Sequence, residues 1–247
     1  MQVETMKTLE TMKRRALPLF ASMLALGAAG VLMTASAATA QESEENADEV
    51  ARKMQAFYDK TKDFQASFKQ VYTDQAAGES KTSVGNVYIK KPGMMRWDYY
   101  QAGKDKKYAL HKSMIADGKA FWIYELEFQQ VFKECLSNSK LPTSVSFLMG
   151  EGDLLESFDA TLTDGSTDKR PVLKLVPKKP TSKYKELRFV LDGGTYQVLK
   201  TTIYDPYGNT NEIVFSKVKF NGNLDAKKFQ FTPPKSARQL NPEKSCP

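Results

Sequence analysis

Along most of the chain apolar and polar residues alternate, which is the period-two pattern of β-strands. The alternation begins at Phe64, and Ala66 and Phe68 share its side of the predicted strand. It recurs in residues 82–90, 94–100, 108–116, 119–125, 128–134, 171–176, 184–191, 196–204 and 211–220. Many strands at such short spacing, joined by tight turns like Asp117-Gly118, predict an antiparallel sheet or barrel.

Two stretches depart from this pattern and show helical spacing. Asn46 is placed to cap a helix that runs to about Lys60 and carries an apolar stripe. Residues 141–158 predict two short amphipathic helices, with a hinge at Gly150-Glu151-Gly152. The resulting fold class is mainly β, of the α+β type, with helices that interrupt or flank the sheet.

The N-terminus has the pattern of a secretory signal. Basic residues 13–15 precede an apolar run, residues 16–33, and the small residues Ala38-Thr39-Ala40 follow it. A transmembrane anchor is the alternative, but the run contains glycine and proline and ends in a cleavage pattern. We therefore expect residues 1–40 to be a cleaved signal peptide and residues 41–247 to form one exported domain.

The net charge and the cysteine content limit the kinds of partner and ligand that we expect. The net charge is +7, but acidic and basic residues are mixed through the chain, which favours solvated surfaces over nucleic-acid binding. Loose attraction to an anionic membrane surface is the second interpretation. Cys135 and Cys246 are a possible disulfide in an oxidising compartment, although unpaired thiols remain equally open. Two thiols and one histidine are too few ligands for a metal site.

Nothing in the sequence points to catalysis. His111 is the only histidine, and no nucleophile elbow of the G-x-S-x-G type is present. The carboxylates of Asp98, Asp117 and Asp205 stand beside predicted turns or strand ends, where aspartate is common. We expect the protein not to be an enzyme and to need no cofactor, and we keep a hydrolase as the weakest alternative.

The aromatic residues are more informative. Trp97 and Tyr99 lie two apart on one predicted strand, and Trp122 and Tyr124 lie two apart on another. Each ring taken singly fits an ordinary core. Taken together, beneath helices that can act as a lid, they predict an apolar cavity on one face of a curled sheet.

Four blocks then resemble one family, the periplasmic lipoprotein carriers of the LolA type. They lie in order along the mature chain: residues 64–70 (FQASFKQ), 87–97 (VYIKKPGMMRW), 117–124 (DGKAFWIY) and 229–234 (FQFTPP), the last preceded by Asp225. The resemblance implies an unclosed antiparallel β-barrel with an α-helical lid over an apolar cavity.

The resemblance also implies a function and its partners. The protein is expected to be a monomeric periplasmic carrier of acylated lipoproteins, moving them from an inner-membrane ABC-type lipoprotein-releasing complex to an outer-membrane lipoprotein receptor. Lys91 stands where many members have arginine and is expected to latch the lid. The expected lining of the lipid-binding cavity is Met95, Trp97, Tyr99, Trp122, Tyr124, Phe147, Leu148, Leu154 and Leu155.

Two further functions fit the same fold. One is an envelope-stress sensor or scaffold, although the predicted mature chain leaves no room for the second domain that such proteins usually carry. The other is a carrier of free lipid or glycolipid.

Overall fold

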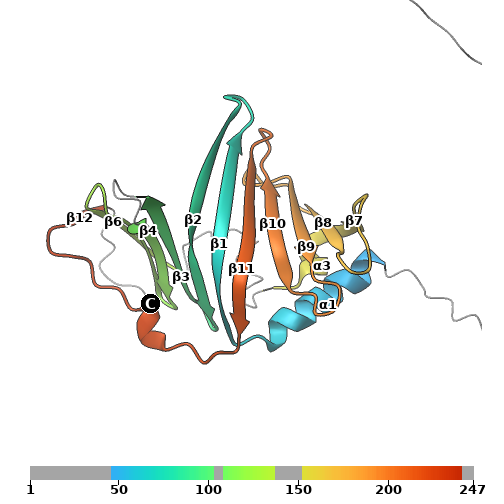
Figure 1. Cartoon of the computed structure of the whole chain (residues 1–247), viewed down its shortest axis with the longest axis horizontal. Coiled ribbons are helices and arrows are strands. Elements are labelled where there is room, and N and C mark those ends of the chain that lie inside the picture. Colours follow the sequence, from blue (N-terminus) through green and yellow to red (C-terminus); the bar gives the residue numbers. More distant parts are fainter. Residues whose placement is uncertain (1–45, 103–107, 137–151, 241–247) are drawn as a thin grey trace, which may run out of the picture. The chain divides into compact units, whose positions relative to one another are not determined.

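The computed structural model describes residues 46–102, 108–136 and 152–240. Contacts divide the chain into residues 1–42 and 43–247, and every described residue belongs to the second unit. The described residues form a 12-stranded sheet with the order β12-β6-β5-β4-β3-β2-β1-β11-β10-β9-β8-β7 (Figure 1). Neighbouring strands are antiparallel, apart from the parallel pair of β12 and β6.

The strands follow the predicted alternation closely. Their bounds are β1 Asp63–Asp74, β2 Glu79–Lys90, β3 Met94–Ala102, β4 Tyr108–Asp117, β5 Ala120–Glu125, β6 Gln130–Cys135, β7 Phe158–Leu162, β8 Val172–Pro177, β9 Glu186–Leu191, β10 Val198–Tyr204, β11 Thr210–Phe220 and β12 Arg238–Leu240. The helical elements are α1 Ala47–Lys60, α3 Leu154–Ser157 and the 3-10 turn η2 Ala226–Phe229.

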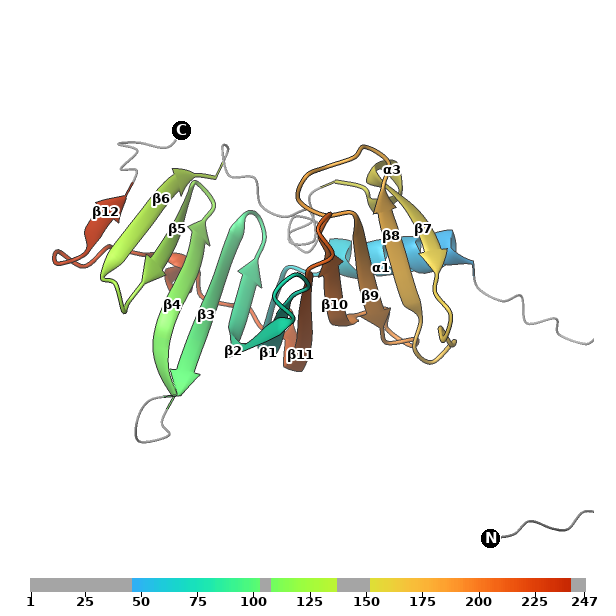
Figure 2. The same ribbon diagram turned by 90° about the horizontal axis from the view of Figure 1, so that it is seen from above.

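The sheet does not close. The two strands at the ends of the order, β12 and β7, do not pair with each other (Figure 2). This confirms the expectation of a mainly β fold with an unclosed, barrel-like sheet. Of the predicted lid helices in residues 141–158, residues 141–151 lie outside the described residues, so this part of the lid remains a prediction.

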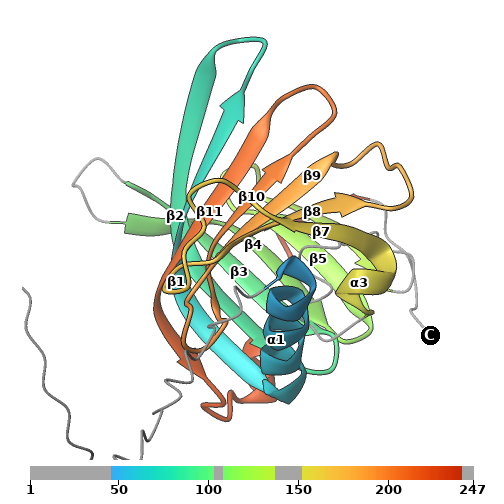
Figure 3. The same cartoon turned by 90° about the vertical axis from the view of Figure 1, so that its right-hand side faces the viewer.

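Helix α1 forms where the sequence predicts it. The side chain of Asn46 accepts a hydrogen bond from the Glu49 amide at 2.9 Å, which satisfies one of the unpaired amides at the helix start. The stripe of Val50, Met54 and Tyr58 is buried. It packs toward α3, β7 and β8, and Figure 3 shows α1 lying across one face of the sheet.

The strands give the sheet two faces, here called inner and outer. The inner face carries the main hydrophobic core together with α1 and includes Phe68 and Trp97. The outer face carries the residues next to these along each strand, such as Ser67 on β1 and Asp98 on β3. Both of them pair with Asn86 on β2, the strand between them. A short aspartate-capped helix, α3, adds Leu154 to the inner core.

Strand β11 contains a bulge that shifts its alternation. Gln65 of β1 pairs with Lys219, but Ser67 pairs with Ser216, so one extra residue is inserted opposite Ala66. Lys217, at the bulge, adopts a φ of 53°. Because of this extra residue, Phe220 and Phe215 both pack against the core although they lie an odd number of positions apart.

The C-terminal segment contains one further strand that the alternation does not predict. After η2 the chain continues to β12, which pairs in parallel with β6 and extends the sheet by one strand. Proline is disfavoured in strands because it lacks a backbone N–H group. The backbone groups that pair with β6 come from the short polar stretch after the prolines.

Candidate functional site

A group of aromatic rings occupies the inner face near the middle of the sheet. The Phe68 ring on β1 lies edge-on to Trp97 and Tyr99 on β3, with 5.0 Å between ring centroids in each case. Phe215 on β11 lies 6.4 Å from Trp97. Such edge-on pairs are favourable beyond their buried area. The arrangement therefore presents a continuous apolar surface drawn from three strands.

Gly85 on β2 makes this arrangement possible. It pairs with Phe68 on one side and with Tyr99 on the other, so its missing side chain leaves room for their two rings to meet. A Cβ at this position would lie 2.5 Å from the Phe68 ring and 2.1 Å from the backbone oxygen of Asp98. Any larger residue would therefore displace the ring or the strand.

Two more apolar side chains continue the same surface. Trp97 pairs with Met114 on β4, and Met114 pairs with Ile123 on β5, which places all three on the inner face. Met114 and Ile123 are only partly buried, whereas Met95 is 1% exposed and belongs to the core. The accessible part of the surface thus lies at Met114 and Ile123 rather than at Met95.

The environment of these side chains is weakly polar. Burial raises the pKa of the Tyr99 hydroxyl to about 12, because the ionised form loses its hydration there. Such surroundings favour apolar ligands over charged ones.

Lys91 lies in the turn between β2 and β3 and contacts α1. Its ammonium donates a hydrogen bond to the Tyr58 carbonyl at 2.5 Å, in the last turn of the helix. Partial burial lowers the pKa of Lys91, and nearby Asp59 opposes that shift. The contact holds α1 rather than α3; a contact with residues 137–151 lies outside what the structure describes. The predicted role as a lid latch therefore remains a prediction.

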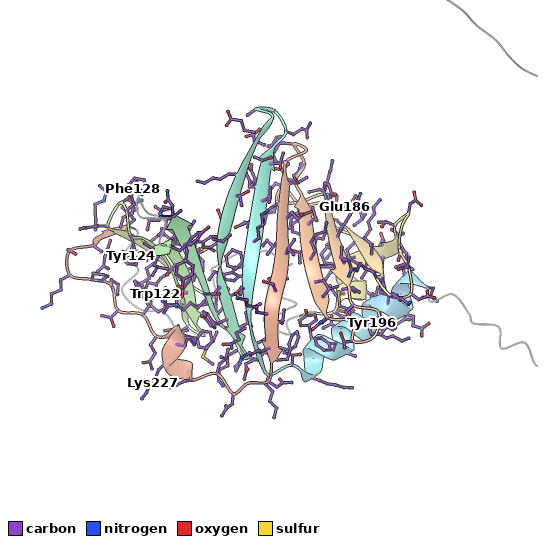
Figure 4. All side chains as sticks on the ribbon, in the orientation of Figure 1. Trp122, Tyr124, Phe128, Glu186, Tyr196 and Lys227 are labelled. Atoms are coloured by element: carbon purple, nitrogen blue, oxygen red, sulfur yellow. The ribbon has the colours of Figure 1, made fainter. Side chains whose placement is uncertain are left out.

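The positions of Trp122 and Tyr124 require a correction. Both lie on the outer face, because Trp122 pairs with Ile115 and Tyr124 with Ser113, next to the inner-face pair of Met114 and Ile123. Phe231 of the C-terminal segment covers them, with ring centroids 6.0 and 5.6 Å away. Both belong to β5, and Figure 4 shows them toward the opposite end of the sheet from Tyr196. They therefore share no cavity with Trp97.

The remaining predicted residues are distributed as follows. Leu154 is buried in the inner core and Leu155 is partly buried against it, while Phe147 and Leu148 lie outside the described residues. Cys135 is buried at the end of β6 and is not a free thiol. Its predicted partner, Cys246, lies outside the described residues, so that pairing stays a prediction.

Other polar groups have structural partners. Asp98 on the outer face accepts hydrogen bonds from Arg96 and from Ser113, and Arg96 also donates to the Lys228 carbonyl of η2. The Nδ1 atom of His111 lies 3.7 Å from the Oε2 atom of Glu127. Within the described ranges no group of three or more histidine, cysteine or carboxylate side chains is arranged to hold a metal ion.

Sequence reasoning missed several inner-face residues. Phe68 belongs to the alternating apolar pattern of its strand. Its contact with the other rings depends on Gly85, which pairs with it on the next strand. Met114 and Ile123 require the register of two hairpins, which alternation within one strand does not supply. Phe215 is displaced from the simple pattern by the bulge in β11.

Comparison with known proteins finds a matching protein family. The family model described as "Outer membrane lipoprotein carrier protein LolA" matches residues 59–232. A protein of Methylococcus capsulatus named outer-membrane lipoprotein carrier protein is 29% identical over 183 residues, covering 74% of this chain and 83% of that protein. One of the same name from Neisseria meningitidis is 26% identical over 209 residues, covering 85% and 92%.

Structural similarity is weaker. A LolA superfamily protein from Nitrosomonas europaea aligns with a TM-score of 0.41 and 12% identity, covering 75% of this chain and 98% of that structure. A similarity this low carries no argument about function. In the part of the chain that the structure describes, no helix has the length and apolar character needed to cross a membrane.

Proposed function

The chain belongs to the LolA family of outer membrane lipoprotein carrier proteins, and we propose that it is a periplasmic chaperone for acylated lipoproteins. In this proposal residues 1–40 direct export and are removed, and residues 41–247 form the carrier domain. The carrier takes lipoproteins released by an inner-membrane ABC-type complex and delivers them to an outer-membrane receptor.

One observation carries the proposal for this chain. The inner face presents a row of apolar side chains, Trp97, Met114 and Ile123, whose last two members remain partly accessible. A long acyl chain gains about 0.8 kcal/mol for each methylene removed from water, which amounts to on the order of 10 kcal/mol per chain. An accessible apolar surface of this kind supports acyl binding.

The chemistry of the surface also suits release. Methionine is unbranched and polarisable, and it adapts to chains of differing shape, while aromatic rings give a broad contact area. The proposed energy for loading comes from the partner complex. The carrier itself therefore has only to cover and uncover its cargo.

The proposal is tested by purifying the protein from the periplasm of its host and identifying bound molecules by mass spectrometry. Met114→Glu places a charge on the accessible apolar surface and is expected to abolish recovery of acylated proteins. Val176→Glu makes a similar change at an exposed position of β8 and is expected to leave recovery unchanged. Met95 is unsuitable for this test, because its full burial would confuse loss of binding with unfolding.

The outcomes separate the alternatives. Recovery of free lipid or glycolipid without acylated protein would favour the free-lipid carrier. Stable association with a membrane-bound regulator, with no acylated molecule present, would favour the sensor or scaffold. Equal recovery from both glutamate variants would contradict a binding role for the inner face.

A further inference from the structure

A groove of about 530 Å³ is lined by residues from five strands of the sheet. Its lining comes from β1, β2 and β11, with Tyr100 and Tyr108 at one end. The lining residues are Ser67, Phe68, Lys69, Val84, Gly85, Asn86, Tyr100, Tyr108, Val214, Ser216 and Lys217. The proposed lipid surface does not include this groove, because most of these side chains belong to the outer face.

The strand register explains why the outer face is hollowed here. One row of direct cross-strand partners runs from Tyr100 through Val84 and Lys69 to Val214. The next row contains short side chains, Asn86, Ser67 and Ser216. Larger residues therefore border a floor of small ones.

The groove has a cationic side. Lys69 and Lys217 are exposed and form no ion pair with a described residue. Among the described residues, the lining contains no acidic side chain. The two carboxylates nearest along these strands are already paired: Asp98 with Arg96 at 2.8 Å, and Glu212 with Lys200 at 3.0 Å.

The groove also has an apolar side and one further hydrogen-bond donor. Val214 is 40% exposed and Tyr108 is 63% exposed, both high values for large hydrophobic residues. The Asn86 side chain accepts from the Ser67 hydroxyl at 3.0 Å, and its amide hydrogens have no acceptor among the described residues. An anion held by the lysines would therefore find a neutral donor beside it.

We infer that this groove binds a small amphiphile that carries a phosphate monoester. Two ammonium groups that have no ion-pair partner among the described residues match the charge of nearly −2 that such a group bears at neutral pH. The tyrosines and valines suit a short apolar body, and the volume lies within the usual range for small-ligand sites. A peptide is less suitable, because the backbone groups at the floor are engaged in strand pairing and no free edge is available for strand addition.

Octyl phosphate, used below its micellar concentration, provides the test. It is expected to bind more tightly than either inorganic phosphate or uncharged octyl glucoside. The double variant Lys69→Gln/Lys217→Gln is expected to weaken octyl phosphate binding by about tenfold and to leave octyl glucoside binding unchanged. Lys185→Gln, an exposed lysine just before β9 and outside the groove, is the matched control and is expected to have no effect.

A second measurement locates the ligand in the unaltered protein. Methyl resonances of Val84 and Val214 are expected to shift with octyl phosphate, while that of Ile123 on the inner face stays in place. The inference is overturned if the double variant binds as well as the unaltered protein, or if only Ile123 shifts. The outcome of this test is independent of the lipoprotein proposal, because the two sites occupy opposite faces of the sheet.

Discussion

At the scale of single residues, Lys91 links the β2–β3 turn to the end of α1. The Tyr58 carbonyl in the last turn accepts a hydrogen bond from the Thr61 amide at 3.0 Å, and the Lys91 ammonium adds a charged donor that opposes the negative end of the helix dipole. The family resemblance places arginine here in many members, and arginine would offer several donors in a fixed fork. Lysine supplies a single flexible group instead.

Removal of this contact should loosen the end of α1. Lys91→Met is expected to lower the free energy of unfolding by about 1 kcal/mol, because the Tyr58 carbonyl loses a charged donor. Amide exchange in the last turn of α1 should accelerate. Lys90→Met, a neighbouring half-buried lysine, serves as the control. Equal losses in the two variants, measured by denaturant titration, would show that Lys91 does not anchor α1.

Tyr99 gives a pH-dependent prediction. Its pKa is raised from 10.0 to about 12 by burial, so folding favours the neutral hydroxyl. The stabilisation is fully present below pH 10, the unfolded value, and is lost as pH rises toward 12. Tyr99→Phe is expected to reduce the loss of unfolding free energy between pH 10 and 11 by about 1 kcal/mol. An unchanged pH slope in urea titrations would mean that the hydroxyl is not buried in solution.

Gly85 determines whether the inner-face rings can meet. Gly85→Ala is expected to cost about 2 to 4 kcal/mol of unfolding free energy, because the new methyl group would meet the backbone oxygen of Asp98 as well as the Phe68 ring. Gly194→Ala is the control, since the nearest contact there is 3.5 Å. Thermal unfolding that does not distinguish the two variants would contradict the close packing described at Gly85.

The sequence correctly predicted which residues of one strand share a face, but not which residues of different strands share a face. The spacing of Trp97 and Tyr99 correctly places both on one face, and that of Trp122 and Tyr124 does the same for β5. Which face each pair shares is fixed by the register across two hairpins, and shifting a register by one residue exchanges the faces. The sequence shows the spacing but not that register.

At the scale of elements, the C-terminal segment acts as a cover for the outer face. Phe229 of η2 is fully buried, and Phe231 packs against Trp122 and Tyr124. The Lys228 ammonium lies 4.1 Å from the centre of the Tyr88 ring, a favourable cation–π distance. The segment thus explains why aromatic residues occur on the face away from α1.

Loss of Phe231 should expose one tryptophan selectively. In a Trp97→Phe background, where Trp122 is the remaining tryptophan, Phe231→Ala is expected to shift the fluorescence maximum to longer wavelength. In a Trp122→Phe background, the same change should leave the emission of Trp97 unaltered. A shift in both backgrounds would mean that Phe231 supports the whole sheet rather than this cover.

The elements themselves were largely predictable, but not all of their pairings. Alternation and the Asp117-Gly118 turn identify β4 and β5, and the cap at Asn46 identifies α1. Strand β12 was not predictable, because its three residues form a strand only by pairing with the edge of β6. The bulge in β11 was also missed, since nothing local to Lys217 requires it.

At the scale of the whole molecule, an open sheet explains how a mainly β protein can present an apolar surface. A closed barrel of ordinary size fills its interior with side chains, whereas an unclosed sheet leaves part of its inner face for another group to cover. Strand spacing predicted the sheet, and the family resemblance predicted that it is unclosed.

The central claim is that acyl chains of lipoproteins lie on the inner face. Its most direct test is photo-crosslinking in living cells, with a benzophenone amino acid at Ile123 on the inner face and, as control, at exposed Val176. The account predicts covalent adducts with acylated lipoproteins from position 123 and none from position 176. Adducts of equal yield at both positions, or no lipoprotein adduct at position 123, would contradict it.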